Sequence, residues 1–453
     1  MQTLQQLRSG ELAGATKIKL SCGLTEFPTE ILELADTLEY LDLSGNKLST
    51  LPAEFSQLKK LKIAFFSDNL FTELPEVLGT LPQLEMLGFK ANKIVTVPEN
   101  SLAKNLRWLI LTNNQIIELP KSIGNCTSMQ KLMLAGNKLR NLPSEMAACR
   151  NLELLRIPAN EIAELPGWLF ELPRLSWLAF AGNPCSKNEI STENLTEIPW
   201  PVLALKEQLG EGASGEIYKA HFQNEASNLS KNVAVKIFKG EVTSDGLPAD
   251  EMQATISAGT HSNLVNVLGK LSQHPQGKQG LVLELIPPAF RNLGNPPSFE
   301  TCTRDTYPEG TAFPWKAVLN IAGGIASAAA HLHKKGIMHG DLYAHNMLTN
   351  KNAHVLFGDF GAATIYNRNS SIADKLEKLE VRAFGYLLED LLERLNFTEN
   401  TEADLDVLIA LKQACLQENI TLRPDFETIT ARISKLQISV SNNANAPISK
   451  FNK

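Results

Sequence analysis

The first part of the chain repeats one pattern of hydrophobic and polar positions. Seven asparagines mark the pattern at intervals of 22 or 23 residues, and they are Asn46, Asn69, Asn92, Asn114, Asn137, Asn160 and Asn183. Each stands at the same place in the frame LxxLxLxxNxLxxLP, as in residues 38–52 and 84–98. An eighth, degenerate copy begins at Ile18, with Gly23 in place of the asparagine. A period of this length predicts a stack of similar units.

The alternation within each copy predicts a short strand. In the LxL step both leucines point to one side of a strand, and their neighbours point to the other side. Stacking would place the asparagines in a column in which each side chain bonds backbone groups as the chain turns. A helical array is excluded because a helix needs apolar steps of three or four. We therefore expect an α/β solenoid of about eight repeats over residues 1–185.

The strand residues that point away from the core would line the concave face of this solenoid. Neighbouring strands lie about 5 Å apart, so these residues form columns. Six apolar side chains gather in the middle of the columns, namely Ile63, Phe65, Met86, Trp108, Ile110 and Met133. Apolar patches rich in aromatic and Met residues are typical of protein interfaces. We expect a protein substrate or a protein regulator to bind there, unless the linker or the second half of the chain covers the patch.

Composition excludes some partners and compartments. The 453 residues carry a formal net charge of −6, which argues against nucleic acid and anionic membranes as partners. The amino-terminal stretch lacks the apolar segment of a secretory signal, and the apolar stretch 317–332 is too short to span a bilayer. The six cysteines are scattered without metal-ligand spacing. We expect a cytoplasmic protein with no membrane span.

The segments that flank the second half are polar. Residues 186–203 are polar and then proline-rich, which predicts a cap and linker. Residues 437–453 are polar and rich in Asn and Ser, which predicts a disordered tail. The stretch between them, residues 204–436, is left as a second domain.

A glycine-rich string opens the second domain. Residues 209–217, LGEGASGEI, contain GxGxxG, which occurs in both dinucleotide and nucleoside triphosphate sites. A dinucleotide fold needs a helix directly after the glycines, whereas residues 217–222, IYKAHF, are typical of a strand. Two strands joined by a glycine-rich turn suit a lid over phosphates, because glycine lets backbone amides approach closely.

A lysine, Lys236, interrupts the next apolar strand, VAVKIF. A lysine there is costly unless it is paired or binds an anion. A short helix is predicted to follow, with Pro248 at its first position and its end at Gly259. The first turn of this helix offers two acids that could pair with Lys236. We favour Glu251 and keep Asp250 as the alternative.

Two further strings complete an ordered set. They are HGDLYAHNML at residues 339–348 and Asp359-Phe360-Gly361. With the glycine-rich turn, VAVK and the acidic helix, their order resembles that of a eukaryotic-type protein kinase domain of the tyrosine-kinase-like lineage. The resemblance covers residues 204–436 and implies an α+β bilobal fold that binds ATP between a sheet-rich and a helical lobe. The repeats in the first half resemble the leucine-rich repeat.

The resemblance implies a role for each matching residue. Asp341 would orient the acceptor hydroxyl and accept its proton, while Lys236, fixed by Glu251, would bind the α- and β-phosphates. Asn346 and Asp359 would bind Mg²⁺ through hard oxygen atoms. The phosphates would be covered by Gly210, Gly212 and Gly215. The adenine would be enclosed by Leu209, Ile217, Ala234 and Leu348. The hinge would be formed by Leu283, Glu284 and Ile286.

The catalytic loop departs from the family. Gly340 replaces the arginine that binds a phosphate on the activation loop, so activation by phosphorylation of this loop is not expected. Tyr343 and His345 stand where basic residues distinguish serine/threonine kinases from tyrosine kinases, so this motif leaves the acceptor open. His345 is either a substitute cation or a merely packed histidine.

The segment after DFG is also unusual. Only residues 362–379 separate it from Glu380, which matches the start of a large-lobe helix, and they contain no APE motif. Arg423, in the late RPxF element, normally pairs with the acid of that motif. It would need another acid here, either Glu377 or Glu380.

These observations predict a function. Every side chain for phosphate chemistry is present, so we expect an ATP- and Mg²⁺-dependent protein kinase that phosphorylates serine or threonine rather than tyrosine. The solenoid would recruit the substrate or a regulator. The alternative is a pseudokinase scaffold that only binds nucleotide. A small-molecule kinase shares the Asp-loop-Asn layout, but the GxGxxG, VAVK and RPxF elements argue against it.

Overall fold

The computed structural model describes residues 2–186, 196–212, 214–224, 229–240, 242–396 and 402–444. The chain forms two compact units. The first comprises residues 1–188 together with residues 239–251, and the second comprises residues 189–238 and 252–453. The predicted linker lies partly outside the described residues, and so does the end of the predicted tail. Among the described residues, no helix combines the length and the apolar character needed to cross a membrane.

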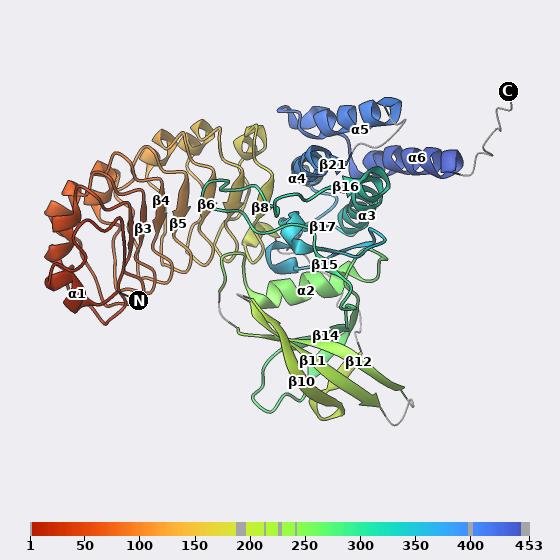
Figure 1. Ribbon diagram of the computed structural model, residues 1–453, viewed down its shortest axis with the longest axis horizontal. Coiled ribbons are helices and arrows are strands. Elements are labelled where there is room, and N and C mark those ends of the chain that lie inside the picture. The colour runs from red at the N-terminus through yellow and green to blue at the C-terminus, as the bar shows by residue number, and fades with distance from the viewer. Residues whose placement is uncertain are drawn as a thin grey trace. The chain divides into compact units, whose positions relative to one another are not determined.

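The first unit is built on a parallel sheet of eight short strands in chain order, β1 to β8 (Figure 1). The strands are Lys17–Lys19, Tyr40–Asp42, Ile63–Phe65, Met86–Gly88, Trp108–Ile110, Lys131–Met133, Leu154–Arg156 and Trp177–Ala179. A short helix, α1 (Leu4–Arg8), precedes them, and the Thr3 hydroxyl caps it by accepting from the Gln6 N–H at 3.2 Å. The predicted α/β solenoid is confirmed.

The chain returns between strands mostly through 3-10 turns. These are η1 to η7, at Thr29–Leu34, Ala53–Gln57, Glu76–Thr80, Lys121–Asn125, Ser144–Ala148, Gly167–Glu171 and Pro184–Ser186. A proline directly precedes each of the first six turns. Proline has no N–H and a fixed φ, so it suits the start of such a turn. The final Pro of the repeat frame therefore marks where each unit turns away from its strand.

The asparagine column forms the predicted ladder. Asn114 is buried, and its Oδ1 accepts from the Ile94 N–H at 3.0 Å. Its Nδ2 donates to the carbonyl oxygens of Phe89 and Leu111 at 2.9 and 3.0 Å. These bonds join neighbouring repeats, because a buried backbone group at a turn must find a partner. The other six asparagines make equivalent bonds.

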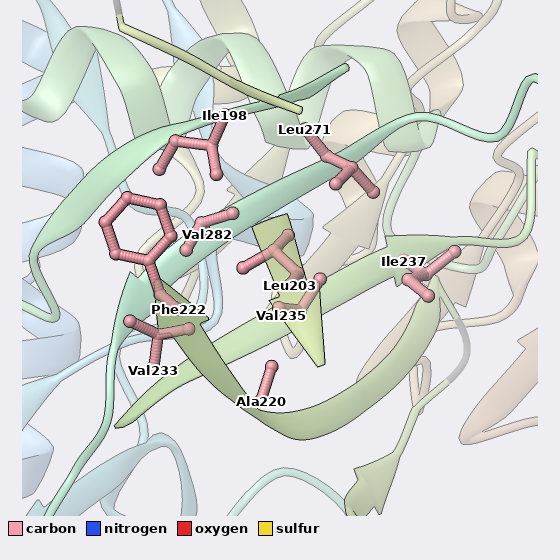
Figure 2. Close-up of a cluster of buried hydrophobic side chains, with 9 residues drawn as sticks. All are labelled: Ile198, Leu203, Ala220, Phe222, Val233, Val235, Ile237, Leu271 and Val282. Atoms are coloured by element: carbon pink, nitrogen blue, oxygen red, sulfur yellow. The ribbon is translucent and has the colours of Figure 1, made fainter. Parts of the chain in front are cut away.

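The second unit contains a six-stranded sheet in the order β10-β11-β12-β14-β13-β9. In that order the strands are Leu203–Glu211, Gly215–Asn224, Leu229–Phe238, Gly280–Glu284, Val267–Ser272 and Glu197–Pro199. All neighbours are antiparallel except β13 and β9. One face carries the buried cluster of Figure 2, formed by Ile198, Leu203, Ala220, Phe222, Val233, Val235, Ile237, Leu271 and Val282.

Helices and short ladders make up the rest of this half. The helices are α2 (Pro248–Ala258), α3 (Trp315–Lys334), α4 (Ala373–Glu393), α5 (Glu402–Cys415) and α6 (Phe426–Ala444). The short strands are β15 (Arg291–Asn292), β16 (Phe313–Pro314), β17 (Ile337–Met338), β18 (Met347–Thr349), β19 (Val355–Phe357), β20 (Thr364–Ile365) and β21 (Leu395–Asn396). The 3-10 turns are η8 (Trp200–Val202), η10 (Ala344–Asn346), η11 (Phe360–Ala362) and η12 (Ile420–Leu422).

Two helix ends bear on the predictions. Helix α2 begins at Pro248 and ends directly before Gly259, as the sequence predicts. Gly259 adopts a φ of +63°, which glycine tolerates without strain. Helix α6 continues to Ala444 and so enters the stretch that was predicted as a tail. Residues 445–453 lie outside the described residues.

Candidate functional site

The glycine-rich turn joins β10 to β11, as the sequence predicts. The Gly212 N–H donates to the Gly215 carbonyl at 2.9 Å and closes the turn. A Cβ at Gly215 would lie 2.6 Å from the Ile237 carbonyl oxygen, so only glycine lets β11 approach β12 there. A Cβ at Gly210 or Gly212 would meet no atom within 4 Å, so packing does not demand glycine at these two positions. Their openness agrees with the predicted role as a cover for phosphates.

One face of the six-stranded sheet collects several predicted ATP-binding residues. Lys236 on β12 lies opposite Ile217 on β11, and Ala234 lies opposite Leu283 on β14. Directly opposite residues of an antiparallel pair point to the same face, as do residues two apart on one strand. These four side chains therefore share one face, and the buried cluster of Figure 2 occupies the other. The alternation of VAVK thus places Lys236 away from the core of the sheet.

The predicted hinge begins where β14 ends. The Glu284 N–H donates to the Asn266 carbonyl at 2.9 Å, and the Asn266 side chain donates to the Glu284 carboxylate at 2.9 Å. These two hydrogen bonds to Asn266 fix Glu284, the last residue of β14. Leu348 lies on β18, half-buried, while Leu209 at the end of β10 is 48% exposed. The roles of these residues and of Ile286 in reading adenine remain predictions.

The two acids of the α2 first turn have different surroundings. Glu251 is 3% exposed and lies at the end of the segment that belongs to the solenoid unit. The Asp250 carboxylate lies against Gly182 of the solenoid, where a Cβ would be 2.8 Å from Asp250 Oδ2. Burial raises the pKa of Asp250. The pairing of Lys236 with Glu251 remains a prediction.

A buried carboxylate on α4 fixes the start of the catalytic loop. Glu380 is 1% exposed and accepts hydrogen bonds from the main-chain N–H groups of His339 and Gly340 at 3.2 and 2.6 Å. His333 on α3 bonds the same carboxylate through Nε2 at 2.7 Å. Burial opposes the charged form, but these bonds outweigh it and hold the pKa of Glu380 below its usual value. No sequence motif pointed to His333, which lies 47 residues from Glu380.

Gly340 is the residue that replaces the family arginine, and its backbone explains part of the change. Its φ is +73°, in the left-handed region that favours glycine. An arginine at this position would require a strained backbone or a different path for the loop. The local backbone conformation therefore favours glycine over the phosphate-binding arginine at position 340.

The predicted base and the predicted metal ligands are neighbours. Asn346 Nδ2 donates to Asp341 Oδ2 at 2.7 Å and to the Asp341 carbonyl at 3.1 Å. Strands β18 and β19 pair Met347 with Phe357, which brings Asn346 beside the chain that leads to Asp359. The Gly358 N–H donates to the Asn346 carbonyl at 3.4 Å and closes this approach. The two candidate ligands thus come from adjacent ends of one short ladder.

The donor set of these two residues fits Mg²⁺. Asn346 uses its amide nitrogen in the bonds to Asp341, which leaves the amide oxygen as the ligand atom. Asp359 is exposed and has a left-handed backbone with φ of +58°, and its Oδ1 accepts from the Gly361 N–H at 3.3 Å. A carboxylate and an amide oxygen are hard donors of the kind that Mg²⁺ takes alongside substrate phosphates.

An acid from residues 287–314, the Pro- and Gly-rich insert that follows the predicted hinge, binds His345. Asp305 Oδ1 lies 2.6 Å from His345 Nδ1, and Asp305 Oδ2 accepts from the His345 main-chain N–H at 3.2 Å. The insert also supplies Asn292, whose side chain donates to the His345 carbonyl at 3.1 Å. Burial lowers the pKa of His345, but the bond to Asp305 outweighs it, so the pKa is raised. Whether His345 acts as a substitute cation or as a packed histidine remains a prediction.

The insert is itself held by α4. Arg304 binds Glu389 and Asp390 at 2.8 Å each, and its guanidinium lies 4.1 Å from the Tyr386 ring centroid. Burial raises the pKa of Asp390 to about 6 despite this pairing. Sequence reasoning missed Asp305 and Arg304, because no periodic pattern relates the Pro- and Gly-rich insert to the catalytic loop. A charged pair, Arg304-Asp305, inside such a segment was the available signal.

The short segment after DFG leaves little chain for an activation loop. Strand β20 pairs with β17 directly after η11, and α4 begins at Ala373. Thr364 on β20 is fully buried, while Ser371 is exposed and Ser370 is half-buried. Of the three Ser and Thr hydroxyls of this segment, that of Thr364 is therefore inaccessible to a modifying enzyme.

The prediction that Arg423 pairs with an acid, Glu377 or Glu380, was wrong. Its guanidinium donates instead to three carbonyl oxygens, of Gln417 at 2.8 Å, Lys378 at 3.0 Å and Glu418 at 3.3 Å. Glu377 accepts from the Phe426 N–H, and Glu380 bonds the catalytic loop. Burial, followed by the neighbouring charge of Arg382, lowers the pKa of Arg423 to about 9, so the group stays charged at neutral pH.

Comparisons with known proteins agree with this geometry. Residues 203–385 match the family described as protein tyrosine and serine/threonine kinase. Residues 37–58 and 105–126 match the Leucine Rich Repeat.

Curated relatives are distant. A probable L-type lectin-domain containing receptor kinase of Arabidopsis thaliana is 27% identical over 220 residues, which make up 48% of this chain and 30% of that protein. An LRR receptor-like serine/threonine-protein kinase of the same plant is 26% identical over 228 residues, 49% of this chain and 17% of that protein. Fibroblast growth factor receptor 1 of Pleurodeles waltl is 27% identical over 205 residues, with shares of 42% and 25%.

The matches therefore span less than a third of the length of these relatives. The fold of each unit and the family matches nevertheless agree. The parallel eight-stranded sheet is that of the repeats, and the six-stranded sheet with its helices is that of the bilobal kinase fold. The chain joins leucine-rich repeats to a domain of the protein tyrosine and serine/threonine kinase family.

Proposed function

We propose that the chain is a protein kinase that transfers the γ-phosphate of ATP to a hydroxyl of another protein. The observation that carries the proposal is the cluster of Asp341, Asn346 and Asp359, in which Asn346 bonds Asp341 directly and lies beside the chain to Asp359. Phosphoryl transfer depends on positioning and on charge stabilisation more than on covalent chemistry. A base next to two hard oxygen ligands meets that need.

Each residue of the cluster has a distinct task. Asp341 orients the acceptor hydroxyl and takes its proton, and the bond from Asn346 holds its carboxylate in one orientation. Asn346 and Asp359 would hold Mg²⁺, which neutralises charge that develops on the phosphates. Lys236, with Glu251 as its proposed partner, binds the α- and β-phosphates. ATP and Mg²⁺ follow from the family in general terms.

The acceptor is proposed to be serine or threonine rather than tyrosine. The relatives include a serine/threonine-protein kinase and a growth factor receptor, so they do not decide the question. The catalytic loop does not decide it either, because Tyr343 stands at the position of the Ser/Thr-kinase lysine and His345, which Asp305 bonds, stands at the position of the tyrosine-kinase arginine. We also propose a cytoplasmic location.

The test compares phosphotransfer from radiolabelled ATP by the wild-type chain and by Asp341→Asn, with phosphosites mapped on a generic protein acceptor. Loss of the proton acceptor should reduce turnover by about a thousandfold. Nucleotide affinity, measured with a fluorescent ATP analogue, should change little because Asp341 does not bind the nucleotide in this scheme. Wild-type turnover in Asp341→Asn would reject the base. A wild-type chain that binds nucleotide without transfer would instead indicate a pseudokinase scaffold.

The solenoid is proposed to bind the protein substrate or a protein regulator. Strand register places Met86 beside Trp108 and Gly88 beside Ile110, so the predicted apolar columns exist. Most of the patch is half-buried, with Met86 only 6% exposed. Trp108 Nε1 lies 3.4 Å from Met133 Sδ, and Lys131 Nζ lies 4.1 Å from the Trp108 ring centroid.

The patch can be tested with Trp108→Ala combined with Met133→Ala. If it binds substrate, KM for the protein acceptor should rise while kcat and the melting temperature stay near wild type. A melting temperature several degrees lower, with unchanged KM, would mean that the patch serves internal packing.

A further inference from the structure

A short segment from the second half of the sequence belongs structurally to the first half. Residues 239–251 connect β12 to α2, yet they form one compact unit with residues 1–188. Three of its contacts with the solenoid end are specific in chemistry and shape. They concern Arg156, Gly136 and Gly182 on the solenoid.

The first contact is an ion pair. Arg156 is the last residue of β7, and its side chain is 1% exposed. Its Nε lies 2.8 Å from Asp245 Oδ1, although 89 residues separate the two in sequence. A guanidinium withdrawn from water is costly unless a carboxylate and hydrogen bonds compensate it. The solenoid therefore carries a buried charge whose partner comes from the segment before α2.

The second and third contacts concern shape. A Cβ at Gly136 would lie 2.6 Å from Val242 Cγ1, and a Cβ at Gly182 would lie 2.8 Å from Asp250 Oδ2. Both glycines directly precede a ladder asparagine and have a positive φ. In four other repeats this position has a φ from 52° to 56° without glycine, at Asp68, Ala91, Asn113 and Ala159. A third glycine, Gly45, stands at this position beside Ser21 of the neighbouring repeat. The backbone alone does not require glycine here, and at Gly136 and Gly182 the missing side chain leaves room for the segment.

The segment contains a hydrogen-bonded turn of its own. The Thr243 hydroxyl accepts from the N–H groups of Asp245 and Gly246 at 3.1 and 3.2 Å, and Thr243 is 5% exposed. The Thr243 N–H donates to the Gly246 carbonyl at 2.9 Å and closes the turn. This turn fixes the direction of Asp245 toward Arg156.

The turn continues without a break into α2. The Leu247 carbonyl accepts from the N–H groups of Asp250 and Glu251 at 3.0 and 3.2 Å, which is the first hydrogen-bonded turn of the helix. Helices are stiff over a few residues, so a displacement of Asp245 would be passed on to Glu251.

We propose that the end of the solenoid is a docking site for residues 242–251 of the same chain, and that Arg156 is a positioning residue that acts through Asp245 on Glu251. The inference rests on the proposed function, since Glu251 affects phosphotransfer only as the partner of the phosphate-binding lysine. The solenoid is then part of the kinase machinery as well as a recruitment surface. A protein that binds Arg156 would compete with Asp245 and lower the rate.

The experiment uses the full chain and a reciprocal charge exchange. The variants are Arg156→Asp, Asp245→Arg and the two combined. Asp245 is 34% exposed on its side chain, so Asp245→Arg should fold even where Arg156→Asp does not. The matched control is Arg140→Ala, because Arg140 forms an exposed ion pair with Glu161 on the same solenoid at 3.2 Å.

Two readouts are measured for each variant, hydrogen exchange of residues 242–258 and the kcat of phosphotransfer at saturating acceptor. Each single exchange should speed amide exchange of this segment about tenfold and lower kcat about tenfold. The combined variant should recover most of both losses, while Arg140→Ala should change neither. Recovery in the combined variant would show that the single exchanges act through the Arg156–Asp245 ion pair and not through general damage to the fold.

The outcomes are decisive. Wild-type exchange in Asp245→Arg would reject the docking site, and faster exchange with wild-type kcat would reject the positioning role of Arg156. No recovery in the combined variant would also reject the pair. If the wild-type chain transfers no phosphate, the proposed function fails, and the hydrogen-exchange results still decide whether the segment docks through Arg156 and Asp245.

Discussion

The solenoid and the candidate catalytic site satisfy buried polar groups in opposite ways. In the solenoid each ladder asparagine makes nearly the same bonds, and each lies about 23 residues from the next, as Asn114 and Asn137 illustrate. Around the catalytic loop each bond is made once, and its partners lie far apart in sequence, as with His345 and Asp305 or His333 and Glu380. Repetition spreads stability over many equivalent contacts, whereas a unique site depends on single ones.

This difference teaches where a substitution should matter for function and where for stability. Apart from the repeats that contact residues 242–250, a repeat contacts only its neighbours, so a loss there stays local in the solenoid. A positioning bond in the catalytic loop acts on reacting groups, so its loss should be visible in the rate before it is visible in stability. Substitutions and pH changes in the two regions should therefore differ in size and in kind.

The largest effect is expected for Asp305→Ala. Without Asp305, His345 loses both the bond to its ring and the bond to its N–H, so the loop between Asp341 and Asn346 loses its fixed position. We expect kcat to fall by about a hundredfold with little change in nucleotide affinity. The control is Glu300→Ala in the same insert, because Glu300 is exposed. Equal loss in Asp305→Ala and in the combined variant with His345→Ala would show that Asp305 acts through His345, whereas additive losses would contradict it.

The next effect concerns the ladder. Asn114→Ala removes the acceptor of the Ile94 N–H and the donor to two carbonyl oxygens, all of them buried. The free energy of unfolding of the solenoid should fall by about 2 kcal/mol, because buried groups are left without partners. Asn105→Ala, which removes one exposed bond to the Pro82 carbonyl, is the matched control. Chemical denaturation measures both, and kcat should not change in either. A drop in kcat alone would break the contrast between the two regions.

A smaller effect is expected from pH. His339 is buried, its ring stacks on Phe357 at 3.8 Å, and burial lowers its pKa. The unfolded chain takes up this proton near pH 6.5, while the folded chain resists it to lower pH. The stability that depends on neutral His339 is therefore complete above about pH 6.5 and is lost as pH falls below it.

The measurement is the melting temperature of the full chain between pH 7.5 and 5.5. We expect the transition of the second unit to fall by about 3 °C more than that of the solenoid, whose transition Asn114→Ala identifies. His339→Gln should flatten this pH dependence, and His354→Gln, at an exposed histidine, should not. Glu380 does not interfere, because its pKa is lowered and its contribution is lost only below about pH 4.5. Asp390 and His345 have raised pKa values and act in the opposite direction, but both remain in His339→Gln, so the difference between this variant and wild type reports His339. An unchanged pH dependence in His339→Gln would contradict the assignment.

The smallest effect is expected from the segment after DFG. Thr364, Ser370 and Ser371 are replaced together by alanine, or, because Thr364 is buried, with valine at that position to keep its volume. Gly340 offers no side chain to bind a phosphate, so basal kcat should stay within about threefold of wild type. Phosphosite mapping and kcat measure the outcome. A loss of a hundredfold or more would show that this loop is activated by phosphorylation after all.

Much of the architecture could be predicted from the sequence because its signals are local. The period of the asparagines and the LxL alternation predict the strands, their parallel order and the concave columns, since both depend only on neighbouring repeats. The start of α2 at Pro248 and its end before Gly259 follow from backbone preferences of single residues. The motif order likewise predicts the kinase family, and the structure places Asp341, Asn346 and Asp359 together.

The tertiary structure decided which distant residues complete these local elements. Arg423 was expected to need an acid, but carbonyl oxygens surround it, because a guanidinium can be satisfied by any acceptor that the fold brings close. Asp305, in an insert without periodicity, reaches His345, and Asp245 reaches Arg156 across 89 residues. Such pairs depend on how whole elements pack. The sequence by itself determined the repeats, the strands and the catalytic motif, and only the packing of the chain decided which charges meet.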